Sequence, residues 1–438
     1  MIDLFYKAYS FWRRYGTRAA IKRIRAELGP KPQFAPAAYS APVIAPSATP
    51  RSAAQLTKAR FEALLPLALY LLPPSPHKRI TVVTDSIARS SLFGGVGTAL
   101  IFATLLANRM GADLRVITRT ERPQADNVDH ILSVYGLTLK GEMQFKFLPI
   151  HERNQSSDFT ESELFITTSW WTTASTLGSV PASSILYLLQ EDERMFYPFG
   201  DDRLRCEEIL ARRDISFLIN TKLLFDHLVA DGLTNIAEMG SYFEPAFPSR
   251  VFRPSSVDKE PGGKRKFIFY ARPNNVRNLF YLGIEVIEAA IAHNVLDLNV
   301  WDIVFVGKDT PDIVFGNGYS PIKRENMSWS EYAALAGTID LGLSLMYTPH
   351  PSYPPLDLAA SGAVVVTNQF GIKQDLRRYS ANLICARAER AALVEALRQG
   401  VALAINQPLR QKNFLGNGLC TDWEVSFSDT IERLAGRH

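Results

Sequence analysis

Two long alternations of strands and helices constrain the fold of this 438-residue chain more than any other feature. In the first, apolar strand-like segments begin at 79–84 and recur as far as 215–219, with helix-forming stretches between most of them. The second begins at 266–270 and continues to 363–366. Continuous apolar strands separated by helices predict parallel sheets that are buried on both faces. We therefore expect an α/β chain with two doubly wound domains.

Changes in composition predict where these domains begin and end. A stretch containing Pro261-Gly262-Gly263 is expected to link the two sheets. Ligands of such sheets bind outside the carboxyl ends of the strands, so we expect a site in the cleft between the domains. The expected organisation is an N-terminal helical extension (1–77), a first α/β domain (78–254), a linker (255–265), a second α/β domain (266–415) and a C-terminal helix that crosses back to the first domain (416–438).

The N-terminal extension contains a candidate amphipathic helix at residues 4–19. Its apolar face carries Phe5, Phe11 and Trp12, and basic side chains flank that face. Such a helix can lie in an anionic membrane surface, or it can pack on the protein's own body or on a partner. A Pro/Ala/Ser-rich linker follows to about residue 52, and helical character resumes over 53–72.

Charge and cysteine content exclude several classes of protein. The first 28 residues hold seven basic and two acidic side chains, whereas the remainder holds 41 basic and 42 acidic ones. A nearly neutral body does not favour nucleic acid as a partner. The three cysteines are far apart, which favours a reducing cytoplasm, and no apolar run is long enough to span a bilayer. We expect a cytoplasmic protein, peripheral at the inner face of the cell membrane if residues 4–19 bind lipid.

The stretch from His350 to Gly362 has the strongest functional pattern. Pro354 and Pro355 introduce a short helix, whose start would suit an anionic group such as phosphate. Asp357, about one turn into that helix, could accept hydrogen bonds from sugar hydroxyls. The alternative is an ordinary capped helix in which Asp357 only complements the helix dipole.

Two other strand ends carry residues suited to phosphate. Gly94-Gly95-Val96-Gly97 opens a helix after the first strand, although a plain strand–helix turn explains the glycines equally well. Arg272 and Arg277 follow the first strand of the second domain and could hold a diphosphate; a solvated basic loop is the alternative. Lys308 follows the next strand and is a third, weaker candidate.

An acidic loop, Gln190–Arg194, follows a strand of the first domain. Its carboxylates could bind an acceptor hydroxyl or act as a base, and Asp192 is our candidate; a charged surface turn is the alternative. Trp170 and Trp171 at another strand end could form a sugar platform, but buried packing is expected instead. No GxSxG, HExxH or P-loop motif is present.

Together these motifs resemble retaining glycosyltransferases of the GT-B fold in the large family-four group, and among these the WsaF-type rhamnosyltransferases. The stretches that carry the resemblance are Leu92–Leu100, Tyr270–Pro273 with Arg277-Asn278, Ser328–Tyr332 and Leu345–Gly362. The resemblance implies two facing Rossmann-like domains, with the acceptor on the first and a nucleotide-sugar on the second. It further implies dTDP-rhamnose as donor, a growing surface glycan as acceptor, no cofactor and no metal.

The resemblance also implies roles for residues around the donor. Asp357 matches the acid on the nucleotide's ribose, and Arg272 and Arg277 match the basic pair on the diphosphate. Ser352 and Tyr353 match positions where the loop meets the donor phosphates.

Two further parts of the chain match the donor site. The segment ending at Met327 matches the strand end whose backbone meets the base, and Gly94 and Gly95 match a glycine loop that closes over the donor. The chain departs from the family's pair of glutamates eight residues apart, because Pro349 stands at the first position and Asp357 at the second. His350, next to Pro349, is expected to take part of the missing acid's catalytic role.

Two other functions fit the same architecture. A non-catalytic glycosyltransferase-like module would bind glycan or a protein partner without transfer. An epimerase-type enzyme would isomerise a nucleotide-sugar without an acceptor. Loss of transfer in Arg272 or Asp357 variants that still fold would favour the transferase over the binding module.

Overall fold

The computed structural model describes residues 52–89, 91–92, 94–151, 154–255 and 263–436. The helix expected at 4–19, the Pro/Ala/Ser-rich linker and most of the linker at 255–265 lie outside these residues. Among the helices that are described, none is long and apolar enough to cross a membrane.

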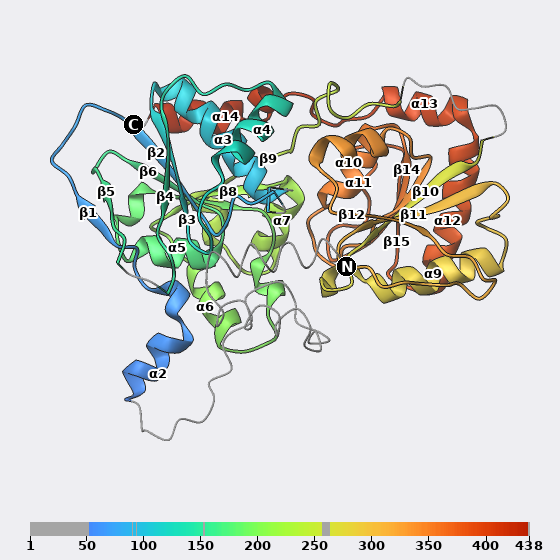
Figure 1. Ribbon diagram of the computed structural model, residues 1–438, viewed down its shortest axis with the longest axis horizontal. Helices are drawn as coiled ribbons and strands as arrows, with labels where there is room; N and C mark the ends of the chain where they lie inside the picture. The colour runs from blue at the N-terminus through green and yellow to red at the C-terminus, as the bar shows by residue number, and fades with distance from the viewer. Residues whose placement is uncertain (1–51, 90, 93, 152–153, 256–262, 437–438) are drawn as a thin grey trace, which may run out of the picture. The chain divides into compact units, whose positions relative to one another are not determined.

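The first sheet is fully parallel and has seven strands (Figure 1). Its central strands are almost entirely apolar and buried, as expected for a sheet covered on both faces. In spatial order the strands are β4 (Met143–Phe147), β3 (Asp113–Thr118), β2 (Arg79–Thr84), β6 (Leu164–Thr167), β7 (Ile185–Leu189), β8 (Ser216–Asn220) and β9 (Gly240–Phe243). Its helices are α3 (Gly95–Met110), α4 (Ala125–Tyr135), α5 (Trp170–Leu177), α6 (Asp201–Leu210), α7 (Lys222–Ala230) and α8 (Asn235–Met239).

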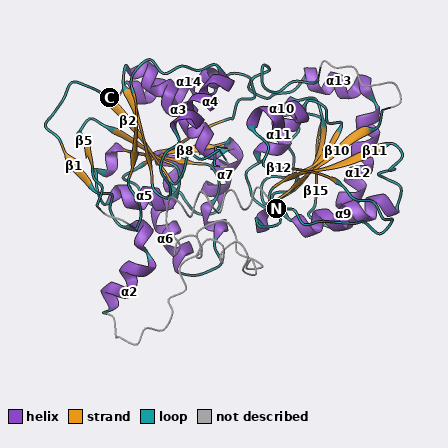
Figure 2. Cartoon of the chain, viewed as in Figure 1, coloured by secondary structure: helices purple, strands orange, loops and turns teal. Residues whose placement is uncertain are grey.

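The second sheet is also parallel and has six strands. Separate apolar cores cover its two faces, one built with α9 and α12 and the other with α10 and α11, which Figure 2 shows as helices flanking the orange strands. In spatial order the strands are β12 (Ile322–Glu325), β11 (Trp301–Gly307), β10 (Arg265–Ala271), β13 (Leu341–Leu343), β14 (Val364–Asn368) and β15 (Leu383–Ala386). The helices are α9 (Phe280–Ala292), α10 (Trp329–Ala336), α11 (Tyr353–Ala360), α12 (Arg390–Ile405) and α13 (Gln407–Leu415).

The last helix, α14 (Trp423–Ala435), packs on α3 of the first sheet. The Phe427 ring lies 4.9 Å from that of Phe102, and Arg109 pairs with Glu432 at 2.8 Å. The segment that leads to α14 runs beside the one that leaves the first sheet, since the Phe247 N–H donates to the Cys420 carbonyl at 2.7 Å.

The helix expected over 53–72 is shorter than predicted. Helix α2 covers only Ala53–Arg60, and β1 (Leu69–Leu71) instead pairs in parallel with β5 (Ser157–Phe159). Helix α2 ends at Arg60 and a 3-10 turn covers Glu62–Leu64, after which Pro66, which lacks an amide hydrogen, disfavours a further helix and leaves the chain beyond it available for strand pairing.

Candidate functional site

The loop before α11 is built around a backbone-bound histidine. The Ser352 N–H donates to His350 Nδ1 at 2.9 Å, and Ser352 adopts a positive φ of 72° as the chain turns into the helix. Tyr353, Pro354 and Pro355 are then the first three helical residues. Because prolines have no N–H, Tyr353 alone supplies a donor among these three positions. This helix start therefore offers a phosphate fewer backbone N–H donors than we expected from the sequence.

Asp357 on α11 is buried, and only one of its two carboxyl oxygens has a hydrogen-bond partner among the described residues. Its Oδ2 accepts a hydrogen bond from the Tyr332 hydroxyl at 3.3 Å, whereas Oδ1 is buried and has no partner among the described residues. Burial raises the pKa of Asp357 well above its usual range. The carboxyl group lines a pocket with aromatic walls that include Trp329 and Phe252. An unpartnered buried oxygen of this kind is an acceptor suited to a hydroxyl of a ligand.

The glycine turn meets α11 at the same pocket. Gly94 has a φ of 79°, which only glycine adopts without strain, and a Cβ there would lie 3.6 Å from the Tyr353 ring. The Tyr353 hydroxyl lies 2.7 Å from Thr98 Oγ1 and accepts from Asn220 Nδ2 at 3.0 Å. This hydroxyl therefore binds the first sheet and its helix α3, where we had expected it to face phosphate.

Gly95 begins α3, and a Cβ on it would lie 2.9 Å from the Gln190 side chain. The N-terminal cap of α3 has no side-chain hydrogen bond. The start of this 16-residue helix lies at the pocket, which Gly94, Gly97 and Thr98 line, so its first-turn N–H groups are candidate donors to an anion.

Arginines follow β10 at the edge of the second sheet. Arg277 Nη1 lies 3.3 Å from Glu191 Oε2, and its guanidinium sits 4.3 Å from the centre of the Phe196 ring. Burial lowers the pKa of Arg277, and the charge of Arg272 adds to that effect. Lys308 follows β11, whose Gly307 pairs in register with Ala271, so it leaves the sheet next to Arg272. Several cations thus gather at one sheet edge.

Met327, expected near a nucleobase, packs its side chain against the core beneath α10 and α11. Ser328 directly after it caps α10 in a reciprocal capping box with Glu331. The backbone of this strand end remains near the pocket because Trp329, two residues later, lines it.

The structure argues against Asp192 as a general acid or base. Arg194 donates to both of its carboxylate oxygens, at 2.8 and 2.7 Å. Although burial opposes ionisation, hydrogen bonds from His227 and Arg194 lower the pKa of Asp192 to about 2. A carboxylate that is this strongly ion-paired is a poor proton acceptor at neutral pH.

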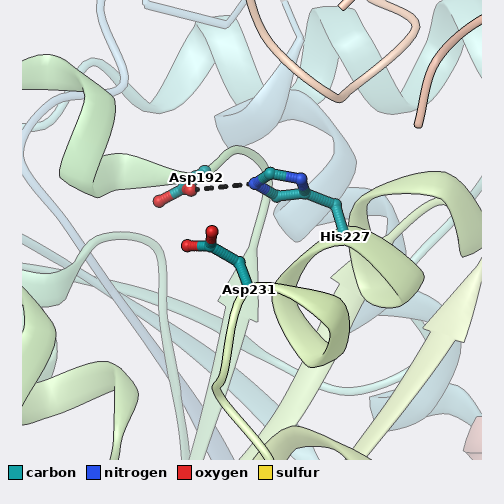
Figure 3. Close-up of side chains that lie close together, drawn as sticks. All are labelled: Asp192, His227 and Asp231. Atoms are coloured by element: carbon teal, nitrogen blue, oxygen red, sulfur yellow. Dashed lines mark ion pairs between the residues drawn. The ribbon is translucent and has the colours of Figure 1, made fainter. Parts of the chain in front are cut away.

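Asp192, His227 and Asp231 approach one another closely enough to suggest a metal site (Figure 3). His227 Nε2 lies 3.4 Å from Asp192 Oδ2. Arg194 Nη2, however, contacts Asp192 at 2.7 Å and Asp231 at 2.8 Å, so a guanidinium already compensates both carboxylates. The cluster is an ion-pair network that fixes the acidic loop.

The carboxyl groups with raised pKa values at this edge are Glu191 and Glu193, which belong to the expected acidic loop although Asp192 was our candidate there, and Asp85, which the sequence did not single out. Glu193 is 3% exposed and accepts from the Trp170 N–H at 2.8 Å, and burial raises its pKa to about 8. Asp85 accepts from Trp171 Nε1 at 2.8 Å, and burial raises its pKa as well. Burial also raises the pKa of Glu191. Position after neighbouring strands was the one signal that could have identified them.

Lys373, in the loop after β14, was also missed. It is fully buried, and its Nζ donates to the carbonyls of Met346 at 2.9 Å and His350 at 3.4 Å. Burial lowers the pKa of Lys373 to about 8. Through these two hydrogen bonds, the Lys373 side chain stabilises the backbone of the loop before α11.

His350 itself is buried and neutral at physiological pH. Burial, reinforced by the charges of Lys373 and Arg277, lowers its pKa to about 3. A neutral imidazole cannot replace the negative charge of a family glutamate, so the expected catalytic role as an acid substitute does not fit.

Two sequence models of one family match the chain over both sheets. The model described as "WsaF, N-terminal domain" matches residues 79–216, and "WsaF, C-terminal domain" matches 265–398. The chain belongs to the WsaF family.

One known protein is similar to this chain over part of its own length. The chain is 28% identical over 285 residues to the O-antigen biosynthesis protein RfbC of Myxococcus xanthus. The match covers 62% of this chain but only 20% of that protein's length.

Solved structures show that this WsaF-family chain has the GT-B fold. Sucrose-phosphate synthase from Thermosynechococcus elongatus superposes with a TM-score of 0.52 at 11% identity, covering 82% of this chain and 100% of that one. HepE from Anabaena, in complex with UDP and glucose, gives 0.52 at 12% identity, covering 82% and 99%. These similarities confirm the expected architecture of two Rossmann-like domains.

Proposed function

We propose that this WsaF-family protein is a glycosyltransferase that transfers rhamnose from dTDP-rhamnose to a growing cell-surface polysaccharide, with retention of configuration. The observation that carries the donor site is Asp357, whose buried Oδ1 has no partner among the described residues and faces an aromatic pocket. We assign this oxygen to a ribose hydroxyl. The family assignment and the similarity to RfbC, an O-antigen biosynthesis protein, support a glycan acceptor.

The diphosphate would lie between the glycine turn and the arginines. Arg272 and Arg277 would offer forked guanidinium donors, and the start of α3 would add N–H donors from the glycine turn. From the loop before α11, only Ser352 and the Tyr353 N–H would contribute to binding the diphosphate. These cations would neutralise the leaving nucleotide.

In the transfer step, the bond between the anomeric carbon and the phosphate oxygen breaks while the acceptor oxygen attacks from the same face. The acceptor's proton passes to the departing phosphate, which leaves as the nucleoside diphosphate. The protein's part is to hold the acceptor and the leaving diphosphate on the same face of the sugar and to stabilise the developing charge through Arg277. Asp85 and Glu193 at the carboxyl edge of the first sheet would bind acceptor hydroxyls.

Purified full-length protein, incubated with dTDP-rhamnose or UDP-glucose and an oligosaccharide acceptor, tests the proposal. We expect acceptor-dependent release of dTDP, with nuclear magnetic resonance showing an anomeric configuration retained from the donor. Isomerised nucleotide-sugar without acceptor would point to an epimerase. Failure to bind any nucleotide-sugar or nucleoside diphosphate would refute donor binding and with it the transferase proposal.

A further inference from the structure

Of the two ring nitrogens of His350, only Nδ1 has a hydrogen-bond partner among the described residues. Its Nδ1 accepts the Ser352 N–H at 2.9 Å, so this nitrogen carries no proton. The proton of the neutral ring must therefore be on Nε2. Backbone geometry, rather than solvent, selects this tautomer.

The protonated nitrogen is buried without a partner. His350 is 4% exposed, and Nε2 has no hydrogen-bond partner among the described residues. Leaving a buried N–H unsatisfied is costly, so a group of this kind usually has a ligand or water to bind. Its neighbours are the ring of Tyr353, 6.0 Å away between centroids, and the charges of Arg277 and Lys373.

We propose that His350 Nε2–H donates a hydrogen bond to a hydroxyl oxygen of the donor sugar and so determines which sugar is accepted. This inference rests on the proposed function, because it assumes that a nucleotide-sugar occupies the cleft. A neutral N–H suits an uncharged hydroxyl, whereas Arg272 and Arg277 supply the permanent charge that a diphosphate needs.

The inference replaces the acid-like role that we expected of His350 from the sequence with the role of a hydrogen-bond donor. The imidazole N–H donates to a lone pair of the hydroxyl oxygen, which an ionised carboxylate cannot do. The site then favours sugars that present an oxygen in that direction. A sugar lacking that oxygen would leave the N–H unsatisfied, which is a strong basis for discrimination.

Two substitutions test the roles of the two ring nitrogens separately. In His350→Asn the amide oxygen can stand where Nδ1 accepts the Ser352 N–H, but no donor reaches the Nε2 position. In His350→Gln the longer amide can place its NH₂ near the Nε2 position instead. His293→Asn, at an exposed residue after α9, is the control for an unrelated histidine substitution.

Dissociation constants of dTDP and of dTDP-rhamnose are measured by calorimetry on the full chain. We expect His350→Asn to weaken dTDP-rhamnose by about five- to tenfold while dTDP changes by less than about twofold. His350→Gln should keep the ratio of the two constants within about twofold of wild type, even if both ligands bind more weakly. The titration stoichiometry reports the folded fraction of each variant.

The ratio of the two constants decides the inference. Equal weakening of both ligands in His350→Asn would assign Nε2–H to the diphosphate, and no change in either would remove it from the donor site; both results overturn the proposal. A loss of sugar affinity that His350→Gln does not restore would show a need for the ring itself, which also overturns it. If wild type binds neither ligand, the donor proposal fails first, a distinct result from a normal wild type with an unaffected variant.

Discussion

Arg277 and Glu191 form an ion pair between the strand ends of the two sheets, with Nη1 3.3 Å from Oε2. Arg277 follows β10 and Glu191 follows β7, so the pair crosses the cleft where the nucleotide-sugar is proposed to bind. A buried ion pair contributes little net stability, because desolvation offsets its attraction. Its clearer consequence is positional, since it holds the guanidinium in the cleft over the Phe196 ring.

Arg277→Ala should lower kcat/KM for transfer by about 100-fold or more, because a charge that stabilises the leaving diphosphate is lost. Arg277→Lys should recover part of this activity, since it keeps the charge but not the forked geometry. Steady-state kinetics with dTDP-rhamnose measure both. Arg398→Ala removes an exposed arginine that pairs within α12 and serves as the control; equal activity of the Arg277→Ala and Arg398→Ala variants would contradict the assigned role.

The raised pKa of Glu193 predicts how stability depends on pH. Unfolded, this carboxyl ionises near its ordinary value of 4.5, but burial keeps its proton in the folded protein up to about pH 8. Between these values the folded state binds more protons, so this group makes stability fall as pH rises, by at most about 1.4 kcal/mol per pH unit. Glu193→Gln should flatten that decline and retain the acceptor for the Trp170 N–H.

Urea unfolding at a series of pH values between 5 and 8 measures this slope. Glu208→Gln, at an exposed site on α6, should leave the wild-type slope intact. A slope that is the same in wild type and in Glu193→Gln would show that Glu193 ionises normally in the folded chain.

Asp357→Asn should separate stability from binding. The substitution removes a carboxyl group that is unfavourably buried, so the ligand-free protein should be at least as stable as wild type. Because the amide can present an NH₂ group where the Asp357 oxygen is proposed to accept from the ribose hydroxyl, affinity for dTDP should fall by about tenfold or more. Thermal unfolding with and without dTDP measures both effects, and an unchanged dTDP-induced stabilisation would exclude Asp357 from the nucleotide site.

Gly97→Ala should strain the turn at the start of α3. A Cβ at this position would lie 2.5 Å from the Leu92 carbonyl oxygen and 2.6 Å from Ile131 Cδ1. We expect a loss of about 1–3 kcal/mol of unfolding free energy, as for other overpacked sites, together with weaker dTDP binding. Gly416→Ala has 3.4 Å of clearance and a negative φ, so in denaturant titrations it should change stability far less; similar losses in the two variants would contradict the steric argument.

Local pattern predicted the central strands well because they are apolar and buried on both faces. It missed the short strands β1, β5, β9, β12 and β15, whose residues are fewer and in part exposed. β12 is the clearest case: its sequence Ile322-Lys-Arg-Glu325 has no apolar run, and pairing with β11 alone makes it a strand. Pairing of that kind depends on a neighbour that is distant in sequence.

The candidate site likewise combines features that the local sequence encodes with features that depend on tertiary contacts. The sequence by itself determined two sheets, the strand ends at which charged residues gather, and the helix that carries Asp357, because local periodicity and turn chemistry encode all three. Only the tertiary structure decided that Asp192 is ion-paired while Glu193 keeps its proton, and that His350 Nδ1 accepts the Ser352 N–H and so leaves the ring proton on Nε2. Adjacent residues of one loop meet different neighbours from other strands, and those neighbours, through burial and hydrogen bonding, determine the protonation state.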